Sequence, residues 1–174
     1  LMEEHGHFEH NVHTLRVVDH IESRYPKFRG LNLTYETREA IAFHSKRRNH
    51  PDVQDFMHNR YPSLEAQIVD LADSIAYNSH DMDDGIESGL LSFDLLSEVS
   101  LWKRMHDQVA EEHALSKKLA KFQVIRKIIN AQVGDVIETT LKNIEEMKIT
   151  AADAARKAAR NNVNFSDEMK RERS

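Results

Sequence analysis

Residues 64–85 carry the side chains best suited to chemistry. Asp73, Tyr77 and Asp81 follow one another at intervals of four residues, and such spacing makes side chains neighbours on one face of a helix. An acid, a phenol and a second acid beside a buried helix face predict a functional site, and a solvated helix with incidental carboxylates is the alternative. The apolar residues that predict the buried face are Leu64, Ile68, Leu71, Ala72, Ile75 and Ala76.

Histidines near the start of the chain supply a second candidate. His10 and His13 stand about one helical turn apart, and Glu9 flanks them. A zinc site and a histidine satisfied within the protein core are the alternatives for this cluster. We prefer a site role for His10, because an imidazole near its unperturbed titration range can donate a hydrogen bond to an anion or carry a proton.

The composition indicates an all-α domain. The 174 residues include 40% hydrophobic residues, 5 glycines and 3 prolines, and long segments keep a helical period. Cysteine is absent, so a metal ion would be bound by His, carboxylates or water. A net charge of -5 argues against a chain-wide nucleic-acid surface. No apolar run approaches the roughly 18 residues of a membrane span, and no leader is recognisable, so we expect no membrane contact and a cytoplasmic location.

Capping residues and helix breakers set the expected limits of the elements. Ser63 is the expected N-cap and Gly85 the expected stop of the central helix, and Thr34 is the expected cap of an earlier one. Residues 45–59 have no clear period and are expected to form a mobile loop, and the chain from Asn161 onward is expected to be polar and frayed. The remaining expected elements are helices over 8–24, 34–44, 92–113, 116–147 and 150–159, the last capped by Thr150, and a short element over 86–91.

Three sequence blocks, in this order, resemble one enzyme family. They are HGHFEHNVHTLRVV, YPKFRGLNLTYETREAIAFH and SLEAQIVDLADSIAYNSHDMDDG. Together they resemble the bacterial deoxyguanosine triphosphate triphosphohydrolases, a branch of the HD-domain phosphohydrolases. The resemblance covers the chain to about Leu91 and continues more loosely through RKIINAQVGDVIETTLKNI.

The resemblance implies an HD-domain-like helical bundle that hydrolyses a deoxynucleoside triphosphate, dGTP or a related one, to deoxynucleoside and triphosphate. It implies a divalent metal ion, Mg, Mn or a similar transition metal, held by a His, a His-Asp pair and a final Asp. Asp73 corresponds to that final metal ligand. Tyr77 corresponds to the tyrosine that lines the sugar and phosphates, and Asp81 to the acid near the sugar 3′-hydroxyl. The FEHN block assigns His10 to the α-phosphate as a catalytic residue and Asn11 to substrate binding.

The upstream motifs of that family are missing from this sequence. The family's first metal His, its His-Asp pair and its HPPFGH-like segment precede the FEHN block, whereas His80-Asp81 and His106-Asp107 match the pair by spelling only. We therefore expect this chain to be the C-terminal part of such an enzyme and to be inactive alone. The expected domains are residues 1–91, the C-terminal part of the HD core; residues 92–160, a helical region packed on that core; and residues 161–174, a polar tail.

Two departures from the family pattern affect the expected substrate site. The family usually reads HNAQS where this chain reads HNVHT, and it usually carries Lys where this chain has Phe43 before His44. That lysine faces the phosphates, and Lys46, Arg47 and Arg48 either replace it or form a solvated basic loop. The departures point to a substrate preference or a regulation that differs from that of a dGTP-specific enzyme.

The alternative function is a noncatalytic helical module that oligomerises or binds a nucleotide as a regulator. Residues 116–147 have more apolar positions than a one-sided surface helix needs, which predicts either core packing or a subunit interface in a homo-oligomer. The basic residues of this segment are either solvated or available to a regulatory nucleotide or single-stranded DNA. They are Lys117, Lys118, Lys121, Arg126 and Lys127.

Overall fold

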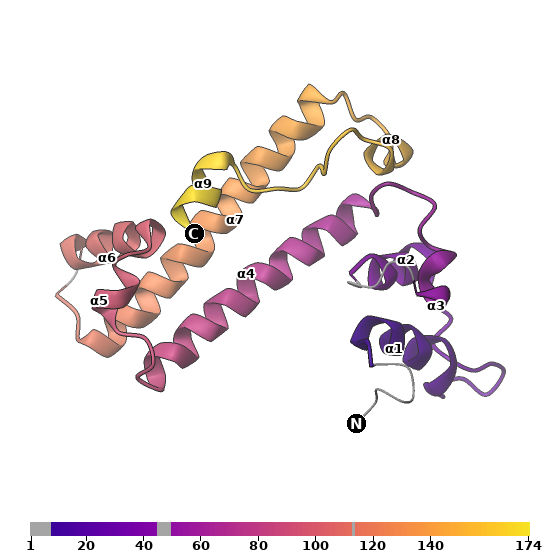
Figure 1. The fold of residues 1–174 in the computed structure, drawn as a ribbon, viewed down its shortest axis with the longest axis horizontal. Helices are drawn as coiled ribbons and strands as arrows, with labels where there is room; N and C mark the ends of the chain where they lie inside the picture. The colour runs from indigo at the N-terminus through magenta and orange to yellow at the C-terminus, as the bar shows by residue number, and fades with distance from the viewer. Residues whose placement is uncertain (1–7, 45–49, 113) are drawn as a thin grey trace. The chain divides into compact units, whose positions relative to one another are not determined.

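The computed structural model describes residues 8–44, 50–112 and 114–174 (Figure 1). These residues form helices and no strand, and an isolated bridge between Ser23 and Gly30 is their one β contact. The predicted all-α class is therefore confirmed. In chain order the elements are α1 (His10–Arg16), the π-helical turn η2 (Val17–Ile21), α2 (Tyr35–His44), α3 (Pro51–Gln54), α4 (Leu64–Glu87), α5 (Phe93–Leu96), α6 (Ser100–Glu112), α7 (Lys117–Glu146), α8 (Ala152–Arg156) and α9 (Asp167–Glu172).

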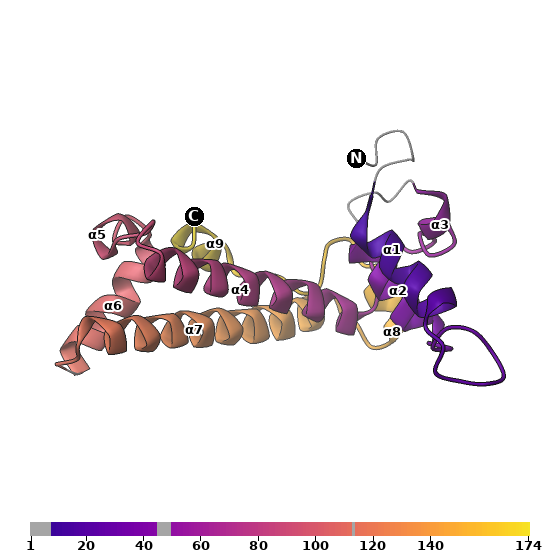
Figure 2. The ribbon, with the colours of Figure 1, turned by 90° about the horizontal axis from the view of Figure 1, so that it is seen from below.

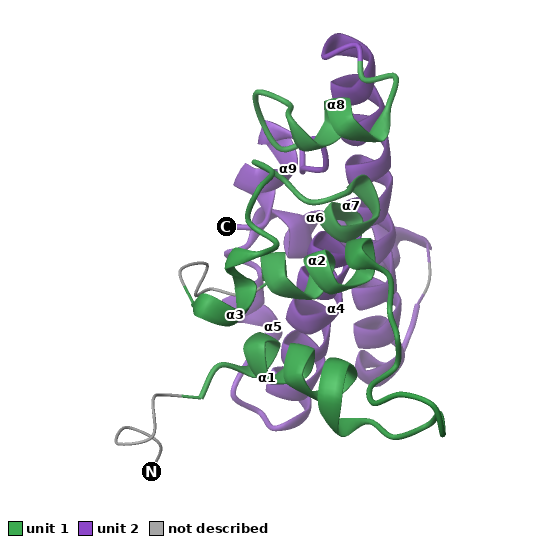
Figure 3. Ribbon diagram, turned by 90° about the vertical axis from the view of Figure 1, so that its right-hand side faces the viewer, with its two compact units in different colours: residues 1–68, 149–161 green, residues 69–148, 162–174 purple. Residues whose placement is uncertain are grey.

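The chain divides into two compact units (Figure 3). Unit 1 comprises Leu1–Ile68 and Ile149–Asn161, and unit 2 comprises Val69–Lys148 and Asn162–Ser174. The division falls inside α4 and does not follow the ranges 1–91, 92–160 and 161–174 expected from the sequence. None of the described helices combines the length and apolar composition of a membrane-spanning segment.

Unit 1 is built on α1, α2 and the short α3. Its core cluster contains Leu15, Ala42, Val53 and Phe56. Gly30 makes the turn between η2 and α2 with a φ of 73°, and a Cβ there would lie 2.3 Å from the Asp19 carbonyl oxygen. Only glycine fits both requirements.

A buried ion pair ties α2 to α8 within unit 1. The Glu39 side chain is fully buried, and Arg156 Nη1 lies 2.6 Å from both of its carboxylate oxygens. Asn59 Nδ2 also donates a hydrogen bond to Glu39 Oε1 at 3.2 Å. A buried carboxylate is tolerated only with such partners, because an unpaired charge in the interior is costly.

Unit 2 is built on α4, α6, α7 and α9. Figures 1 and 2 show α4 and α7 running alongside each other in opposite directions. Lys121 of α7 links them, with its Nζ 2.7 Å from Asp83 Oδ1 and 2.8 Å from Glu87 Oε2. The buried core cluster of this unit comprises Ile75, Leu96, Leu101, Trp102, Met105, Val109, Val124, Ile128, Phe165 and Met169.

Serine or threonine side chains cap three helices, and the expected caps Ser63 and Thr34 are confirmed. Ser63 Oγ accepts a hydrogen bond from the Ala66 amide at the start of α4, and Ser116 Oγ accepts one from the Leu119 amide at the start of α7. Thr34 Oγ1 accepts from the Thr37 amide before α2. The N-terminal boundaries of these helices follow from capping by a nearby serine or threonine side chain, which can be recognised in the sequence.

The first helix is shorter than the predicted range of 8–24. The α-helix ends at Arg16 and continues as the π-helical turn to Ile21, which the Glu22 amide closes by donating to the Val17 carbonyl at 3.0 Å. Within the expected loop over 45–59, α3 begins at Pro51, which suits a first helical turn. The loop prediction is wrong for α3, and residues 45–49 lie outside the described residues.

Gly85 does not end the central helix as predicted. The helix continues to Glu87, so the separate element expected over 86–91 does not form, and Gly89 with a φ of 77° follows the helix end. A Cβ at Gly85 would lie 2.6 Å from Leu91 Cδ1. Glycine at position 85 therefore allows Leu91 to pack against the helix.

The helix expected over 92–113 is two helices. Ser92 caps α5 through a hydrogen bond from the Leu95 amide, and α6 begins anew at Ser100. The last short helix, α8, starts after Ala151 without a side-chain cap, so Thr150 is not its N-cap.

The expectation of a frayed tail after Asn161 is wrong. Phe165 and Met169 are buried in the core of unit 2, and Ser166 caps α9. The Asp135 carboxylate of α7 accepts hydrogen bonds from the Ser166 amide at 2.9 Å and from its hydroxyl at 2.5 Å. The burial of Phe165 and Met169 and the hydrogen bonds of Ser166 to Asp135 therefore hold this segment in place, although its composition is polar.

We predict that Arg156→Met destabilises the fold by about 3–5 kcal/mol, because it leaves the Glu39 carboxylate buried without its cation. The double variant Glu39→Met with Arg156→Met should lose less, since it leaves no uncompensated charge. Urea unfolding followed by circular dichroism measures both. The exposed neighbour Lys157, changed to Met, is the control, and an equal loss in Lys157→Met and Arg156→Met would refute the role of the pair.

The Lys121 ion pairs predict a pH dependence of stability. The hydrogen bond from Lys121 holds the pKa of Glu87 below its ordinary value of 4.5, and hydrogen bonds to Asp83 and Glu87 raise the pKa of Lys121 above 10.5. The ion pairs therefore contribute their full stabilisation between pH 4.5 and pH 10.5. This stabilisation is lost as the pH falls through the folded-state pKa of Glu87, and it is lost again as the pH rises through the folded-state pKa of Lys121, above 10.5. Melting temperatures of the wild type and Lys121→Met should converge below pH 4.5. A difference that stays constant down to acid unfolding would contradict this, and Lys103→Met on the exposed side of α6 is the control.

Candidate functional site

The helix α4 separates a buried stripe from an exposed one. Ile75 and Ser79 are 5% and 3% exposed, and Leu71, Met82 and Ile86 pack against the core of unit 2 at the same helical period. The Ser79 hydroxyl donates to the Ile75 carbonyl at 2.7 Å, which satisfies it inside the core. The predicted buried face is confirmed at Leu71 and Ile75 and is wrong at three positions, since Ile68, Ala72 and Ala76 are exposed.

Asp73, Tyr77 and Asp81 form the exposed stripe, which we call the α4 stripe. All three side chains are exposed, Tyr77 to 65%. No side-chain hydrogen bond or ion pair to a described residue engages any of them. Each four-residue step along the helix rises about 6 Å, so the stripe offers two carboxylates with a phenol between them to a ligand outside the chain.

His10 and Asn11 lie together at the start of α1 in unit 1. Glu9 caps the helix by accepting a hydrogen bond from the Val12 amide at 2.8 Å, and its other oxygen lies 3.7 Å from His10 Nδ1. The His10 imidazole is exposed, and its ring centroid lies 6.4 Å from that of His44. The Glu9 carboxylate that caps the helix therefore also lies beside the His10 imidazole.

The side chain of Asn11 is buried, with the residue 6% exposed. Its amide nitrogen Nδ2 has no hydrogen-bond partner among the described residues. A buried donor without a hydrogen-bond partner destabilises the fold by roughly 1–3 kcal/mol. A ligand or a further protein group that accepts a hydrogen bond from Asn11 Nδ2 would remove this cost.

The sequence-predicted residues fall into two groups. The structure brings His10 and Asn11 together at α1, and it brings Asp73, Tyr77 and Asp81 together on α4, each group within its own unit. Lys46, Arg47 and Arg48, considered as phosphate-binding substitutes, lie outside the described residues.

The described residues do not by themselves compose a metal site. Over 8–44, 50–112 and 114–174, no group of three or more His, Asp or Glu side chains is arranged to hold a metal ion. Asp73 offers one unpaired carboxylate, which is a single ligand. The described donor set therefore does not fit a complete catalytic metal centre, which requires several ligands held in geometry.

The basic residues of α7 are largely engaged within unit 2. Lys121 pairs with Asp83 and Glu87, Lys127 Nζ lies 2.8 Å from Glu112 Oε1, and Lys117 Nζ lies 4.9 Å from the centre of the Phe93 ring. These contacts favour the structural interpretation of the basic residues over a nucleic-acid surface.

Several apolar residues of α7 remain outside the core. Val124 and Ile128 are buried, which accounts for part of the apolar excess in the predicted helix over 116–147. Core packing does not account for the exposed set, which comprises Leu119, Phe122, Val133, Ile137 and Leu141.

Comparison with known proteins finds relatives that match most of this chain. A protein of Geobacter metallireducens is 41% identical over 95% of this chain, one of Thiobacillus denitrificans is 43% identical over 90%, and one of Ralstonia pickettii is 45% identical over 98%. All three carry the name deoxyguanosinetriphosphate triphosphohydrolase-like protein. The chain spans 43–45% of the length of these relatives. No family model matches the chain. The identities confirm the family resemblance: this chain is homologous to a segment of the deoxyguanosinetriphosphate triphosphohydrolase-like proteins.

Proposed function

We propose that this chain is part of an enzyme that hydrolyses a deoxynucleoside triphosphate, dGTP or a related one, to deoxynucleoside and triphosphate. The observation that carries the proposal is the α4 stripe, in which Asp73, Tyr77 and Asp81 are exposed and form no side-chain hydrogen bond or ion pair with a described residue. Asp83 and Glu87 of the same helix, in contrast, form ion pairs with Lys121.

Asp73 is the proposed metal ligand. A divalent ion such as Mg or Mn would take one carboxylate oxygen from Asp73, and its other ligands would come from residues outside the described set. An exposed carboxylate without a competing cation is ready to ligate, since hard divalent ions prefer carboxylate oxygen.

Tyr77 and Asp81 are the proposed sugar-binding residues. The Tyr77 ring can pack against the sugar and donate its hydroxyl hydrogen to a phosphate oxygen. The Asp81 carboxylate, two turns beyond Asp73, can accept a hydrogen bond from the 3′-hydroxyl. A ribose 2′-hydroxyl would crowd Tyr77, which gives the site a preference for deoxynucleotides.

His10 and Asn11 are the proposed residues for the phosphates. Protonated, the exposed His10 imidazole can donate to an α-phosphate oxygen and then move a proton, and a Glu9 carboxylate oxygen lies 3.7 Å from its Nδ1. The free donor of Asn11 suits a substrate oxygen.

The full-length parent protein should release triphosphate from a deoxynucleoside triphosphate in the presence of a divalent metal, and Asp73→Ala should reduce the rate to background. The free energy of unfolding should change by no more than about 0.5 kcal/mol, because the side chain is exposed. Anion-exchange chromatography of the products measures the rate.

Asp107→Ala is the matched control, since Asp107 is an exposed acid of unit 2 that follows a histidine. It should keep the wild-type rate. Retention of turnover in Asp73→Ala would overturn the metal assignment, and release of triphosphate by the 174-residue chain alone would show that it contains a complete site.

Substitutions at Tyr77 and Asp81 test the sugar assignment in the parent protein. Asp81→Asn should reduce kcat/KM about ten- to a hundredfold for 3′-hydroxyl substrates, as expected for the loss of a hydrogen bond to a charged group worth roughly 1.5–3 kcal/mol, and much less for 3′-deoxy analogues. Tyr77→Ala should weaken the discrimination against ribonucleotides. Equal losses on both substrate types would assign Asp81 to the fold or the metal instead.

The exposed apolar set of α7 supports a second proposal, that the protein forms a homo-oligomer through this helix. Ile137→Lys should then lower the molar mass measured by light scattering to that of the monomer, whereas Glu138→Lys on the adjoining exposed position should not. A wild-type protein that is monomeric at working concentration would contradict the interface.

A further inference from the structure

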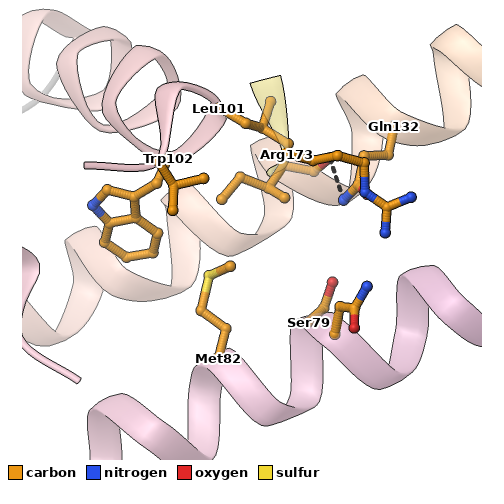
Figure 4. Close-up of a pocket in the computed structure, with 9 residues that line it drawn as sticks. Ser79, Met82, Leu101, Trp102, Gln132 and Arg173 are labelled. Carbon is orange, nitrogen blue, oxygen red and sulfur yellow. Dashed lines mark hydrogen bonds between the residues drawn. The ribbon is translucent and has the colours of Figure 1, made fainter. Parts of the chain in front are cut away.

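A cavity of about 220 Å³ lies within unit 2 between α4, α6, α7 and the residue that follows α9 (Figure 4). Ser79 and Met82 point into it from α4, facing Leu101, Trp102, Gln132 and Arg173. Arg173 and Gln132 lie over Ser79 at one end, and Trp102 lies at the other, with Met82 between. The cavity therefore has a polar end and an apolar end.

Arg173 carries a charge that unit 2 does not neutralise. It is half-buried, and its guanidinium lies 4.3 Å from the centre of the Phe165 ring. No described carboxylate forms an ion pair with it, whereas Arg104 on α6 is paired with Glu172. Burial lowers the pKa of the Arg173 guanidinium, yet arginine keeps its proton at physiological pH. A partly desolvated cation held only by an aromatic ring gains from an anionic partner.

We propose that this cavity binds a small aromatic anion, with its ring against Met82 at the apolar end and its carboxylate or phosphate group on Arg173. A guanidinium can form two parallel hydrogen bonds to either anionic group. The volume lies below the roughly 300–1,000 Å³ of sites for drug-sized ligands, so the ligand is of single-ring size and smaller than a nucleoside triphosphate.

The cavity is distinct from the proposed hydrolytic site. Its α4 residues, Ser79 and Met82, belong to the buried stripe of the helix, and Tyr77 and Asp81 belong to the exposed one. The ligand proposal needs no part of the hydrolase proposal, and either can fail alone.

Trp102 gives the experiment a specific reporter. It is the single tryptophan of the sequence and is fully buried at the cavity wall. The 174-residue chain is labelled with ¹⁵N, and its one indole N–H cross-peak is followed during titration with benzoate and with phenyl phosphate. We expect a saturable shift with at least one of them, and the tighter of the two identifies the preferred anionic group. Benzyl alcohol, which lacks the charge, and acetate and inorganic phosphate, which lack the ring, should bind at least about tenfold more weakly.

Arg173→Gln should weaken binding of the aromatic anion about tenfold or more, and Arg173→Lys should weaken it less. Arg171→Gln, on the exposed side of α9, is the matched control and should bind as the wild type does. If Arg173→Gln does not fold, the comparison of benzoate with benzyl alcohol on the wild type still decides the role of the charge. The absence of a saturable shift, equal binding of benzyl alcohol and benzoate, or equal weakening by Arg171→Gln and Arg173→Gln would each overturn the proposal.

Discussion

The rotation of α4 about its own axis is the constraint on which the candidate site depends. Burial of an apolar side chain such as Ile75 stabilises a fold by roughly 1.5–3 kcal/mol, and burial of an unpaired carboxylate costs more than that. A rotation by two residue positions, about 200°, would place Asp73, Tyr77 and Asp81 where the buried stripe lies and would withdraw Ile75 from the core. The same packing that stabilises unit 2 therefore keeps Asp73, Tyr77 and Asp81 on the outer side of the helix.

Acids that connect helices within each unit pair with a cation, whereas the acids of the α4 stripe pair with no described residue. Glu39 is buried against Arg156 in unit 1, and Asp83 and Glu87 are held by Lys121 in unit 2. Asp73 and Asp81, on the same helix as Asp83, have no such cation among the residues that the structure describes. Among the cations near the core of unit 2, Arg173 likewise has no ion pair with a described carboxylate, whereas Arg104 pairs with Glu172. The proposals for α4 and for the cavity both rest on this contrast between paired and unpaired charges.

Local chemistry made much of the fold predictable, and long-range packing explains the rest. Ser63 and Ser116 cap the helices that the hydrophobic period predicts, and the class of the fold follows from that period. Gly85 was expected to be a stop because a glycine commonly ends a helix, but contact with Leu91 gives it a packing role instead. Phe165 and Met169 sit in a segment with polar composition, and their burial depends on partners far away in the sequence. The cavity was not predicted for the same reason, since α4, α6, α7 and Arg173 meet only in the folded unit.

If the exposed side of α4 binds a nucleotide, a footprinting experiment should show that the bound nucleotide protects it. Ala76 is exposed beside Tyr77, and the 174-residue sequence contains no cysteine, so Ala76→Cys introduces a defined thiol into this segment of the parent protein. The measurement is the alkylation rate of that thiol, followed by peptide mass spectrometry with and without a deoxynucleoside triphosphate and a divalent metal. We predict that the nucleotide slows alkylation at Ala76→Cys and leaves the rate at Ala110→Cys, on the exposed side of α6, unchanged. An alkylation rate at Ala76→Cys that does not respond to saturating nucleotide would contradict it.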